Sequence, residues 1–228
     1  MLFIAEIGMN HNGNLDLCNE LVRQAKWAGA DIAKFQLGWR ANPDEINHIT
    51  PNDLKKIEEI CKYNNIEFMA SIITEEGFDL SNHVNFNRYK IASRTVIDKP
   101  DLVHSILKIG KPTFLSLGMW EKDELPFKEY NNVTYMWCKS LYPTYPWDLK
   151  DLPKSFNEID IDGYSDHSAG IEIVLTAIAR GATVIEKHFT LDKSDTTIRD
   201  HGLSATPEEF RTMVNLGRNI YKNNLLGV

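Results

Sequence analysis

Two histidines, His167 and His188, are the residues of this chain whose types and spacing most directly permit chemistry. Each ends a short apolar run that we expect to be a strand, and the two runs are consecutive strands of the chain. Neighbouring parallel strands lie about 4.8 Å apart. Side chains two residues apart share one face of a strand, so Ser165 lies on the face of His167. Glu186 lies in the same way on the face of His188, and we expect two imidazoles and a carboxylate to converge.

This pair of histidines predicts a divalent metal site with open coordination positions. Two histidines with few other protein ligands suit a catalytic Mn²⁺, Mg²⁺, Zn²⁺ or Fe²⁺ ion better than a closed structural site. The alternative is that one imidazole acts as a general acid or base and that no metal binds. The spacing alone leaves both interpretations open.

Lys34 and Lys90 each follow apolar neighbours within an expected strand. A buried charge is costly unless it is paired or used. Hydroxyl groups occur at the ends of several expected strands, namely at Ser71, Ser93, Ser116 and Ser165. Each serine alone is an ordinary strand-end residue, but hydroxyls around two inward lysines can bind a phosphate ester. The combination therefore favours an anion site.

Eight short apolar runs alternate with amphipathic segments along the chain. The expected strands are Phe3–Ile7, Ile32–Phe35, Glu67–Ser71, Arg88–Ala92, Thr113–Leu117, Thr134–Trp137, Ile161–Ser165 and Val184–His188. The expected helices are Leu15–Ala28, Asn52–Tyr63, Glu75–Asn82, Pro100–Ile109, Glu121–Tyr130, Asp148–Phe156, Ile171–Arg180 and Pro207–Lys222. Gly29, Gly110 and Gly181 follow helical runs as C-terminal caps, and Thr206 precedes the last helix as an N-cap.

This alternation predicts a (β/α)₈ TIM barrel that forms a single domain over residues 1–228. In such a barrel the catalytic groups lie at the carboxyl ends of the strands, where the polar residues of this sequence collect. An open doubly wound sheet shares the same alternation. No expected strand is followed by a Gly-x-Gly-x-x-Gly turn, which disfavours the dinucleotide-binding form of that sheet.

The composition is that of an ordinary globular protein, with 43% hydrophobic and 25% charged residues. A formal net charge of −7 argues against nucleic acid and anionic membranes as partners. Cys18, Cys61 and Cys138 are widely spaced and odd in number, which predicts no disulfide framework and fits a reducing compartment. No signal peptide or apolar run of about 20 residues is present. We expect a cytoplasmic protein that acts on small molecules.

Five motifs occur in order along nearly the whole chain. They are Glu6-Ile7-Gly8-x-Asn10-His11-x-Gly13, Lys34-Phe35-Gln36, Lys90-Ile91-Ala92-Ser93, Ser165-Asp166-His167-Ser168 and Glu186-Lys187-His188-Phe189-Thr190. Together they resemble the sialic acid synthase family, which includes N-acetylneuraminate, legionaminate and pseudaminate synthases and spore-coat polysaccharide proteins. The resemblance implies the same barrel.

The resemblance also implies an activity, the condensation of phosphoenolpyruvate with an aldose such as N-acetylmannosamine. The products would be a 2-keto-3-deoxy sugar acid and phosphate. It implies a metal, typically Mn²⁺, on His167 and His188, and Glu6 as the acidic residue that orients or deprotonates the attacking water. Asp200 completes the expected catalytic set. The expected substrate-binding residues are Asn10, His11, Lys34, Gln36, Ser71, Lys90, Ser93, Ser116, Ser140, Tyr142, Ser165, Glu186 and Arg199.

The sequence departs from the family pattern mainly on the sugar side. The usual Ser-Thr-Pro-Phe reads Ala70-Ser71-Ile72-Ile73, and the usual Ser-Thr-Gly-Met reads Ser116-Leu117-Gly118-Met119. The usual Gly-Pro-Asp-His reads Ile198-Arg199-Asp200-His201. The resemblance further implies a C-terminal antifreeze-like domain, absent from this sequence, whose arginine reaches a neighbouring subunit's sugar site. We expect Arg199, or a homodimer or separate partner chain, to compensate.

Two other functions remain open on the residues alone. One is a metal-dependent aldolase or synthase that acts on a different aldehyde. The other is a non-catalytic barrel that binds a phosphorylated metabolite. The joint presence of Glu6, Lys34, Lys90, His167 and His188 argues against a non-catalytic scaffold, because a scaffold gains nothing from inward charges.

Overall fold

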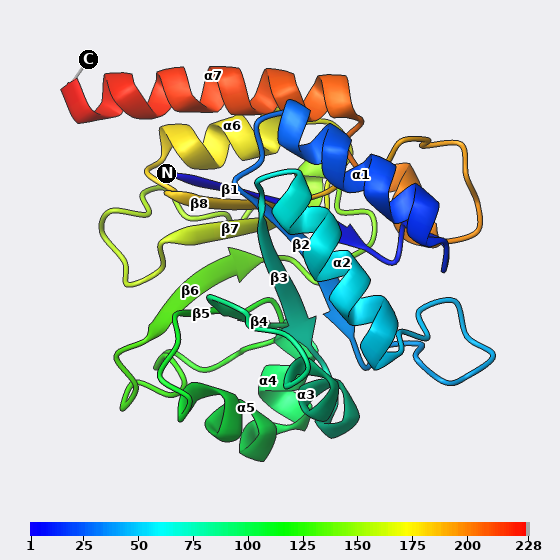
Figure 1. Ribbon diagram of the computed structural model, residues 1–228. Coiled ribbons are helices and arrows are strands. Elements are labelled where there is room, and N and C mark those ends of the chain that lie inside the picture. The colour runs from blue at the N-terminus through cyan, green and yellow to red at the C-terminus, as the bar shows by residue number, and fades with distance from the viewer. Residues whose placement is uncertain (227–228) are drawn as a thin grey trace.

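A computed structural model describes residues 1–226, and its eight strands form one closed parallel barrel (Figure 1). The strands are β1 (Leu2–Gly8), β2 (Ile32–Leu37), β3 (Glu67–Ile72), β4 (Tyr89–Ile91), β5 (Thr113–Ser116), β6 (Val133–Cys138), β7 (Gly163–Asp166) and β8 (Val184–His188). The predicted TIM barrel is confirmed, and no predicted strand end is displaced by more than two residues.

The pairing of the first and last strands closes the barrel. Ile4 of β1 lies opposite Glu186 of β8, and Glu6 lies opposite His188. An open doubly wound sheet would leave these two strands as separate edges. The register therefore excludes that alternative and brings the first and fifth sequence motifs together.

Helices cover the outside of the barrel, some of them beside β1, β2 and β8 and the others beside β3, β4 and β5 (Figure 1). They are α1 (Leu15–Trp27), α2 (Pro51–Tyr63), α3 (Glu75–Ser81), α4 (Ser93–Asp98), α5 (Pro100–Leu107), α6 (Glu172–Ala179) and α7 (Pro207–Leu226), with 3₁₀ turns η1 (Pro146–Asp148) and η2 (Arg199–Leu203). The three expected cap glycines have φ values of 80° to 101°. The amide of Glu209 donates to Thr206 Oγ at 3.3 Å, as expected for the N-cap of α7.

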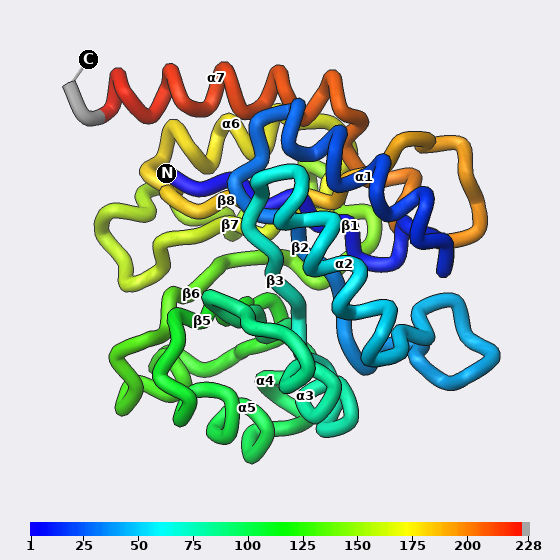
Figure 2. The backbone as a smooth tube through the Cα atoms, in the orientation of Figure 1, coloured from blue at the N-terminus to red at the C-terminus, as the bar shows by residue number. Residues whose placement is uncertain are grey.

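Two predicted helices are wrong, and both contain a proline in their interior. Residues 121–130 form turns around Pro126, and residues 148–156 form turns after η1 (Figure 2). Proline lacks the amide that an inner helical turn needs. The freed carbonyls find side chains instead: Tyr135 donates its hydroxyl to Pro126 O, and Arg180 donates to the carbonyls of Leu152 and Pro153.

The sequence pattern did not predict one of the observed helices. Helix α4 begins directly after β4, at Ser93, where the sequence suggested only the end of a strand. Its six residues are too few to show a helical hydrophobic period, and its N-cap Ala92 makes no capping hydrogen bond through its side chain. This helix carries Arg94.

The barrel interior holds a small hydrophobic cluster of its own, separate from the larger core between strands and helices. Its buried members are Ile4, Ile32, Met69, Phe114, Met136 and Val184. Side chains two residues further along each strand point to the same interior. Those positions hold Glu6, Lys34, Ser71, Ser116, Cys138 and Glu186. An apolar layer thus fills one end of the barrel and supports a polar layer above it.

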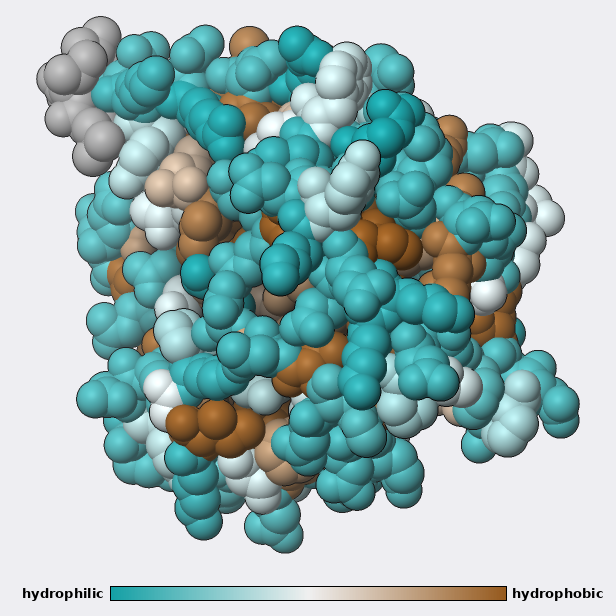
Figure 3. Space-filling view, viewed as in Figure 1, coloured by the Kyte–Doolittle hydropathy of each residue, from teal (hydrophilic) through white to brown (hydrophobic). Residues whose placement is uncertain are grey.

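The face that carries α1, α2 and α7 is mostly hydrophilic, with scattered hydrophobic patches (Figure 3). Within residues 1–226, no helix is both long and apolar enough to cross a bilayer.

Candidate active site

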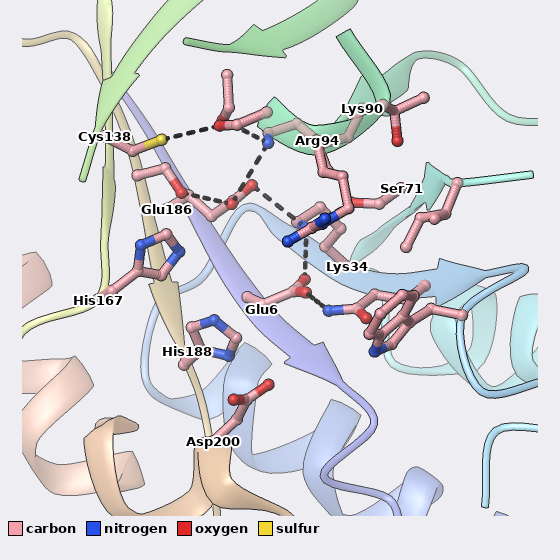
Figure 4. A pocket seen from close by; sticks show the side chains of 18 of the residues that line it. Glu6, Lys34, Ser71, Lys90, Arg94, Cys138, His167, Glu186, His188 and Asp200 are labelled. Carbon is pink, nitrogen blue, oxygen red and sulfur yellow. Dashed lines mark hydrogen bonds and ion pairs between the residues drawn. The ribbon is translucent and has the colours of Figure 1, made fainter. Parts of the chain in front are cut away.

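The polar layer forms the floor of a cavity of about 320 Å³ at the carboxyl ends of the strands (Figure 4). All eight strands or the loops after them contribute to its wall. The lining residues are Glu6, Lys34, Gln36, Trp39, Ser71, Ile73, Lys90, Ala92, Ser93, Arg94, Thr95, Ser116, Cys138, Tyr142, Ser165, His167, Glu186, His188, Arg199 and Asp200.

Lys34 is the centre of a buried ion-pair network. Its Nζ lies 2.7 Å from Glu6 Oε2 and 3.5 Å from Glu186 Oε2. It also donates to Ser71 Oγ at 2.8 Å. The side chains of Lys34 and Glu6 are each only 3% exposed, so these charges interact in a medium of low dielectric constant.

Lys90 points into the barrel from β4, with Ser71 of β3 between it and Lys34, and most of its contacts are longer than those of Lys34. It donates to Ser116 Oγ at 2.7 Å and to the carbonyl oxygen of Ile91 at 3.5 Å, and its Nζ lies 3.6 Å from Glu186 Oε1. Ser165 donates to the same Glu186 oxygen at 2.8 Å. An ammonium group has three donors, so Lys90 keeps donor capacity for a ligand.

The two buried carboxyl groups differ in protonation. Burial alone would raise the pKa of Glu186, but the charges of Lys34 and Lys90 lower it to about 2. Burial raises the pKa of Glu6 to about 7, against the opposing effect of Lys34. Glu186 is therefore a fixed anion, whereas Glu6 exchanges a proton near neutral pH. Burial also lowers the pKa of Lys90.

Glu6 is held by a second contact that depends on a glycine. Gln36 Nε2 donates to Glu6 Oε1 at 2.6 Å. Gly8 follows a register shift at the end of β1 and has a φ of 55°. A Cβ at this position would lie 3.1 Å from both Gln36 Nε2 and Glu6 Oε1. The glycine of the first motif therefore leaves room for this hydrogen bond.

His167 and His188 lie side by side on the wall opposite Lys34 (Figure 4), with ring centroids 5.6 Å apart. His167 Nδ1 lies 2.8 Å from the carbonyl oxygen of Lys139, so Nδ1 carries the proton and Nε2 keeps its lone pair. His188 Nδ1 is buried and has no hydrogen-bond partner in the described part of the chain. Burial lowers the pKa of both imidazoles, that of His188 to about 4. Both rings are neutral at neutral pH.

A row of side chains in contact leads from the histidines to the rim of the cavity. The ring of Tyr142 lies 4.2 Å from that of His167, and the Arg199 guanidinium lies 4.6 Å from the Tyr142 ring. Arg199 Nε also lies 3.4 Å from Asp200 Oδ1. Figure 4 shows the Asp200 carboxylate next to His188.

The donor set fits a metal ion with open positions rather than a closed cage. Neutral imidazoles with a free nitrogen lone pair are metal ligands, and an unpartnered buried nitrogen at His188 is otherwise costly. Among residues 1–226, no group of three or more His, Cys, Asp and Glu side chains is arranged to hold a metal. His167 and His188 would therefore share the ion with substrate or water.

Most of the expected site residues meet in this cavity, but three do not. Ser140 lines only a second, adjoining cavity. Asn10 is buried with its amide bonded to Phe189 O and Ser204 Oγ, each at 3.0 Å. His11 bonds Asn47 Oδ1 at 3.2 Å. Asn10 and His11 thus brace the loop after β1 and lie outside the wall of the cavity.

Several lining residues were not expected from the sequence, among them Trp39, Arg94 and Cys138. Cys138 could have been found, because it stands two residues after the interior residue Met136. Its Sγ lies 3.2 Å from Ser93 Oγ, which accepts a hydrogen bond from the amide of Gly118 at 2.9 Å. Trp39 lies in a loop and Arg94 in helix α4, both beyond the strands. The alternation that predicts inward side chains along a strand does not extend to these positions.

Comparison with known proteins shows the family of this chain. The model of the NeuB family matches residues 44–226. This chain belongs to the NeuB family. It is 34% identical to the N,N'-diacetyllegionaminic acid synthase of Campylobacter jejuni, over 97% of this chain and 76% of that protein. It is 32% identical to the human N-acetylneuraminate-9-phosphate synthase, over 92% of this chain and 67% of that protein.

Solved structures agree with this assignment. The N-acetylneuraminic acid synthetase of Leptospira borgpetersenii, in complex with citrate, superposes with a TM-score of 0.85 at 29% identity. The match covers all of this chain and 85% of that one. A Thermotoga maritima DAHP synthase has a TM-score of 0.70 at 12% identity, which shows a shared fold only. The predicted resemblance to sialic acid synthases is confirmed, and so is the prediction of an enzyme.

Proposed function

We propose that this NeuB-family member condenses phosphoenolpyruvate with an aldose to give a 2-keto-3-deoxy sugar acid and phosphate. The observation that carries the proposal is the pairing of two buried lysines with two neutral histidines across one cavity. Lys34 and Lys90 supply positive charge for the phosphate and carboxylate of phosphoenolpyruvate. Ser71 and Ser116 hold the two ammonium groups in place.

The reaction joins two carbons and releases one phosphate. The methylene carbon of phosphoenolpyruvate attacks the aldehyde carbon, and the aldehyde oxygen takes up a proton to become a hydroxyl group. Water adds to the cationic carbon that bears the phosphate and loses a proton. The carbon–oxygen bond to phosphate then breaks, and the remaining hydroxyl loses its proton to leave a ketone. We propose Glu6 as the group that orients or deprotonates this water, because its raised pKa of about 7 suits a general base near neutral pH.

We propose that His167 and His188 hold a divalent metal ion, with Mn²⁺ as the first choice. A bound ion would supply Lewis-acid polarisation of the aldehyde oxygen. The protein's own contribution is to keep both imidazoles neutral by burial and to fix the ring of His167 through Lys139 O. Neutral imidazole is the form that ligates a metal.

The test is a coupled assay of phosphate release with Mn²⁺, phosphoenolpyruvate and a panel of neutral and phosphorylated aldoses. Release that depends on both phosphoenolpyruvate and one aldose would support the proposal. Release only with an aldehyde that is not an aldose would favour a synthase for another aldehyde. Tight phosphoenolpyruvate binding without release for any aldehyde would contradict the proposal and favour a non-catalytic barrel.

The Glu6→Gln variant is expected to lower kcat by about 10²- to 10⁴-fold, the usual effect of losing a general base. The pKa of Glu6 is raised to about 7, and a base acts in its deprotonated form, so kcat/KM of the wild type should rise as pH passes through about 7. The variant should lose this limb of the profile. Rates measured from pH 5.5 to 9 would show it.

Glu59→Gln on the exposed face of α2 is a matched control that should keep both rate and profile. A limb near pH 7 that persists in Glu6→Gln would belong to the substrate or to another group. That result would contradict the assignment of Glu6.

We further propose that the protein works in the cytoplasm, since its cysteines are free and buried. A homodimer or a separate chain is proposed to complete the sugar side of the site.

A further inference from the structure

A second cavity of about 750 Å³ adjoins the first at the carboxyl ends of the strands. Its own wall comes from the loops after β5 and β6, and includes Met119, Trp120 and Leu141. Six residues line both cavities, namely Ala92, Ser93, Arg94, Cys138, Tyr142 and Arg199. A ligand longer than phosphoenolpyruvate can therefore extend from the first cavity into the second.

Two arginines stand at the boundary between these cavities. Arg94 comes from α4, which follows β4, and Arg199 comes from η2, which follows β8. Figure 4 shows the Arg94 side chain directed from α4 into the first cavity. The two guanidinium groups thus reach one ligand path from two different strand ends.

Both arginines have guanidinium N–H donors that are not used in short hydrogen bonds. The ion pair of Arg94 with Asp98 is long, at 3.9 Å, and both side chains are at least half exposed. Arg199 has one contact with Asp200, at 3.4 Å through Nε. A guanidinium carries five N–H donors that suit two-point binding of carboxylate or phosphate. Most of those donors therefore remain available to a ligand.

The position of Arg199 is held in advance. Its guanidinium lies over the Tyr142 ring, 4.6 Å from the centroid, and that ring packs against His167 at an interplanar angle of 39°. Contact with an aromatic face limits the rotamers of a long side chain, so less entropy is lost when an anion binds.

The lysines near the two arginines already have other partners, so the arginines are available for a second anion. Lys34 and Lys90 serve the first anionic substrate and already face Glu6 and Glu186. Lys139 in the second cavity is paired with Asp151 at 2.8 Å. The lining of the second cavity holds three cations, Arg94, Lys139 and Arg199, and two acids, Glu121 and Asp151, so it carries a net charge of +1 in a chain whose net charge is −7.

We propose that Arg94 and Arg199 bind a second anionic group, a phosphate or carboxylate at the far end of the acceptor aldose. The assignment of the ligand as the acceptor rests on the proposed condensation, but binding of the anion by the two arginines does not require turnover. The aldehyde end of the acceptor lies near His167 and His188, and the charged end lies between the two arginines. The acceptor is therefore an acidic aldose rather than a neutral one.

The test compares three acceptors at saturating phosphoenolpyruvate: N-acetylmannosamine, its 6-phosphate and a hexuronic acid that carries a carboxylate. Wild type should have the lowest KM for one of the two anionic aldoses, and which one is preferred tells phosphate from carboxylate. Arg94→Gln and Arg199→Gln should each raise that KM by about 10- to 100-fold, the usual worth of a hydrogen bond to a charged group. The KM for the neutral aldose should rise by less than about threefold.

Arg23→Gln is the matched control, because Arg23 is also an exposed helical arginine that pairs with a carboxylate, that of Glu20. It should change no KM. Equal losses for neutral and anionic aldoses in the two site variants would overturn the proposal. So would a rise in the KM for phosphoenolpyruvate that is as large as the rise for the acceptor, since the arginines would then bind the first substrate.

Calorimetric titration keeps the anion site separate from the reaction. With phosphoenolpyruvate present, the wild type should bind the preferred anionic aldose at least tenfold more tightly than the neutral one, and Arg94→Gln should abolish the difference. Such a result without any turnover would refute the condensation and leave the anion site standing. Equal affinity of wild type for all three aldoses would refute the anion site, even if condensation occurs.

Discussion

Replacement of His188 by glutamine is expected to lower kcat for condensation by about 10³-fold and to weaken Mn²⁺ binding by a comparable factor. Polarisation of the aldehyde by a metal is worth several kcal/mol of barrier, which corresponds to this change in rate. His188 is 6% exposed and neutral, and its Nδ1 has no hydrogen-bond partner among residues 1–226, so little else in the described fold depends on its side chain. The main loss should be of ligation rather than of stability.

Two measurements separate these effects. Titration of Mn²⁺, followed by electron paramagnetic resonance, reports ligation without turnover, and thermal unfolding reports stability. Treatment with a chelator should inactivate the wild type, and added Mn²⁺ should restore it but not rescue His188→Gln. His83→Gln at an exposed position is the control. Unchanged Mn²⁺ affinity in His188→Gln would show that this residue is no ligand.

Replacement of Lys187 by methionine is expected to lower the free energy of unfolding by about 3–5 kcal/mol, the usual cost of breaking a buried ion pair from one side. Lys187 Nζ lies 2.5 Å from Asp166 Oδ2, and both side chains are fully buried. Lys187 also donates to the carbonyl of Ser168. Tyr164 donates its hydroxyl to Asp166 Oδ1 at 2.6 Å. Without the ammonium, a carboxylate would be left buried and uncompensated.

Urea unfolding would measure this change, and a second substitution tests its cause. The double variant Asp166→Asn, Lys187→Met removes both charges and should regain a large part of the loss. Lys193→Met, which breaks a partly exposed pair with Glu209, should cost no more than about 1 kcal/mol. If Lys187→Met cost as little as Lys193→Met, the buried pair would not be a main stabilising contact of β7 and β8.

The sequence by itself determined the barrel and the inward order of its polar residues. Strand identity depends on a local alternation of period two, and this period also tells which side chains share a face. His167 and His188 could therefore be placed together, and Lys34 and Lys90 could be recognised as inward charges. The cap glycines and Thr206 were equally readable, because a helix end needs a particular backbone conformation or side-chain acceptor within a few residues.

The tertiary structure alone decided the electrostatics and the outer boundary of the site. The sequence gives no distance between Lys34, Glu6 and Glu186. The unequal pKa values of the two carboxyl groups follow only from their burial and from the charged groups that each of them faces. Asn10 and His11 belong to a recognisable motif, yet their hydrogen bonds fix a loop outside the cavity.

Arg94 is the converse case, a residue of the cavity wall that no sequence motif indicated. It lies in a helix too short to have a hydrophobic period, and a single charged residue after a strand looks like any solvated side chain. Only the closure of the barrel brings it to a mouth that it shares with Arg199, more than one hundred residues later in the chain. Local patterns specify which face a side chain takes, but long-range packing decides which other side chains it meets there.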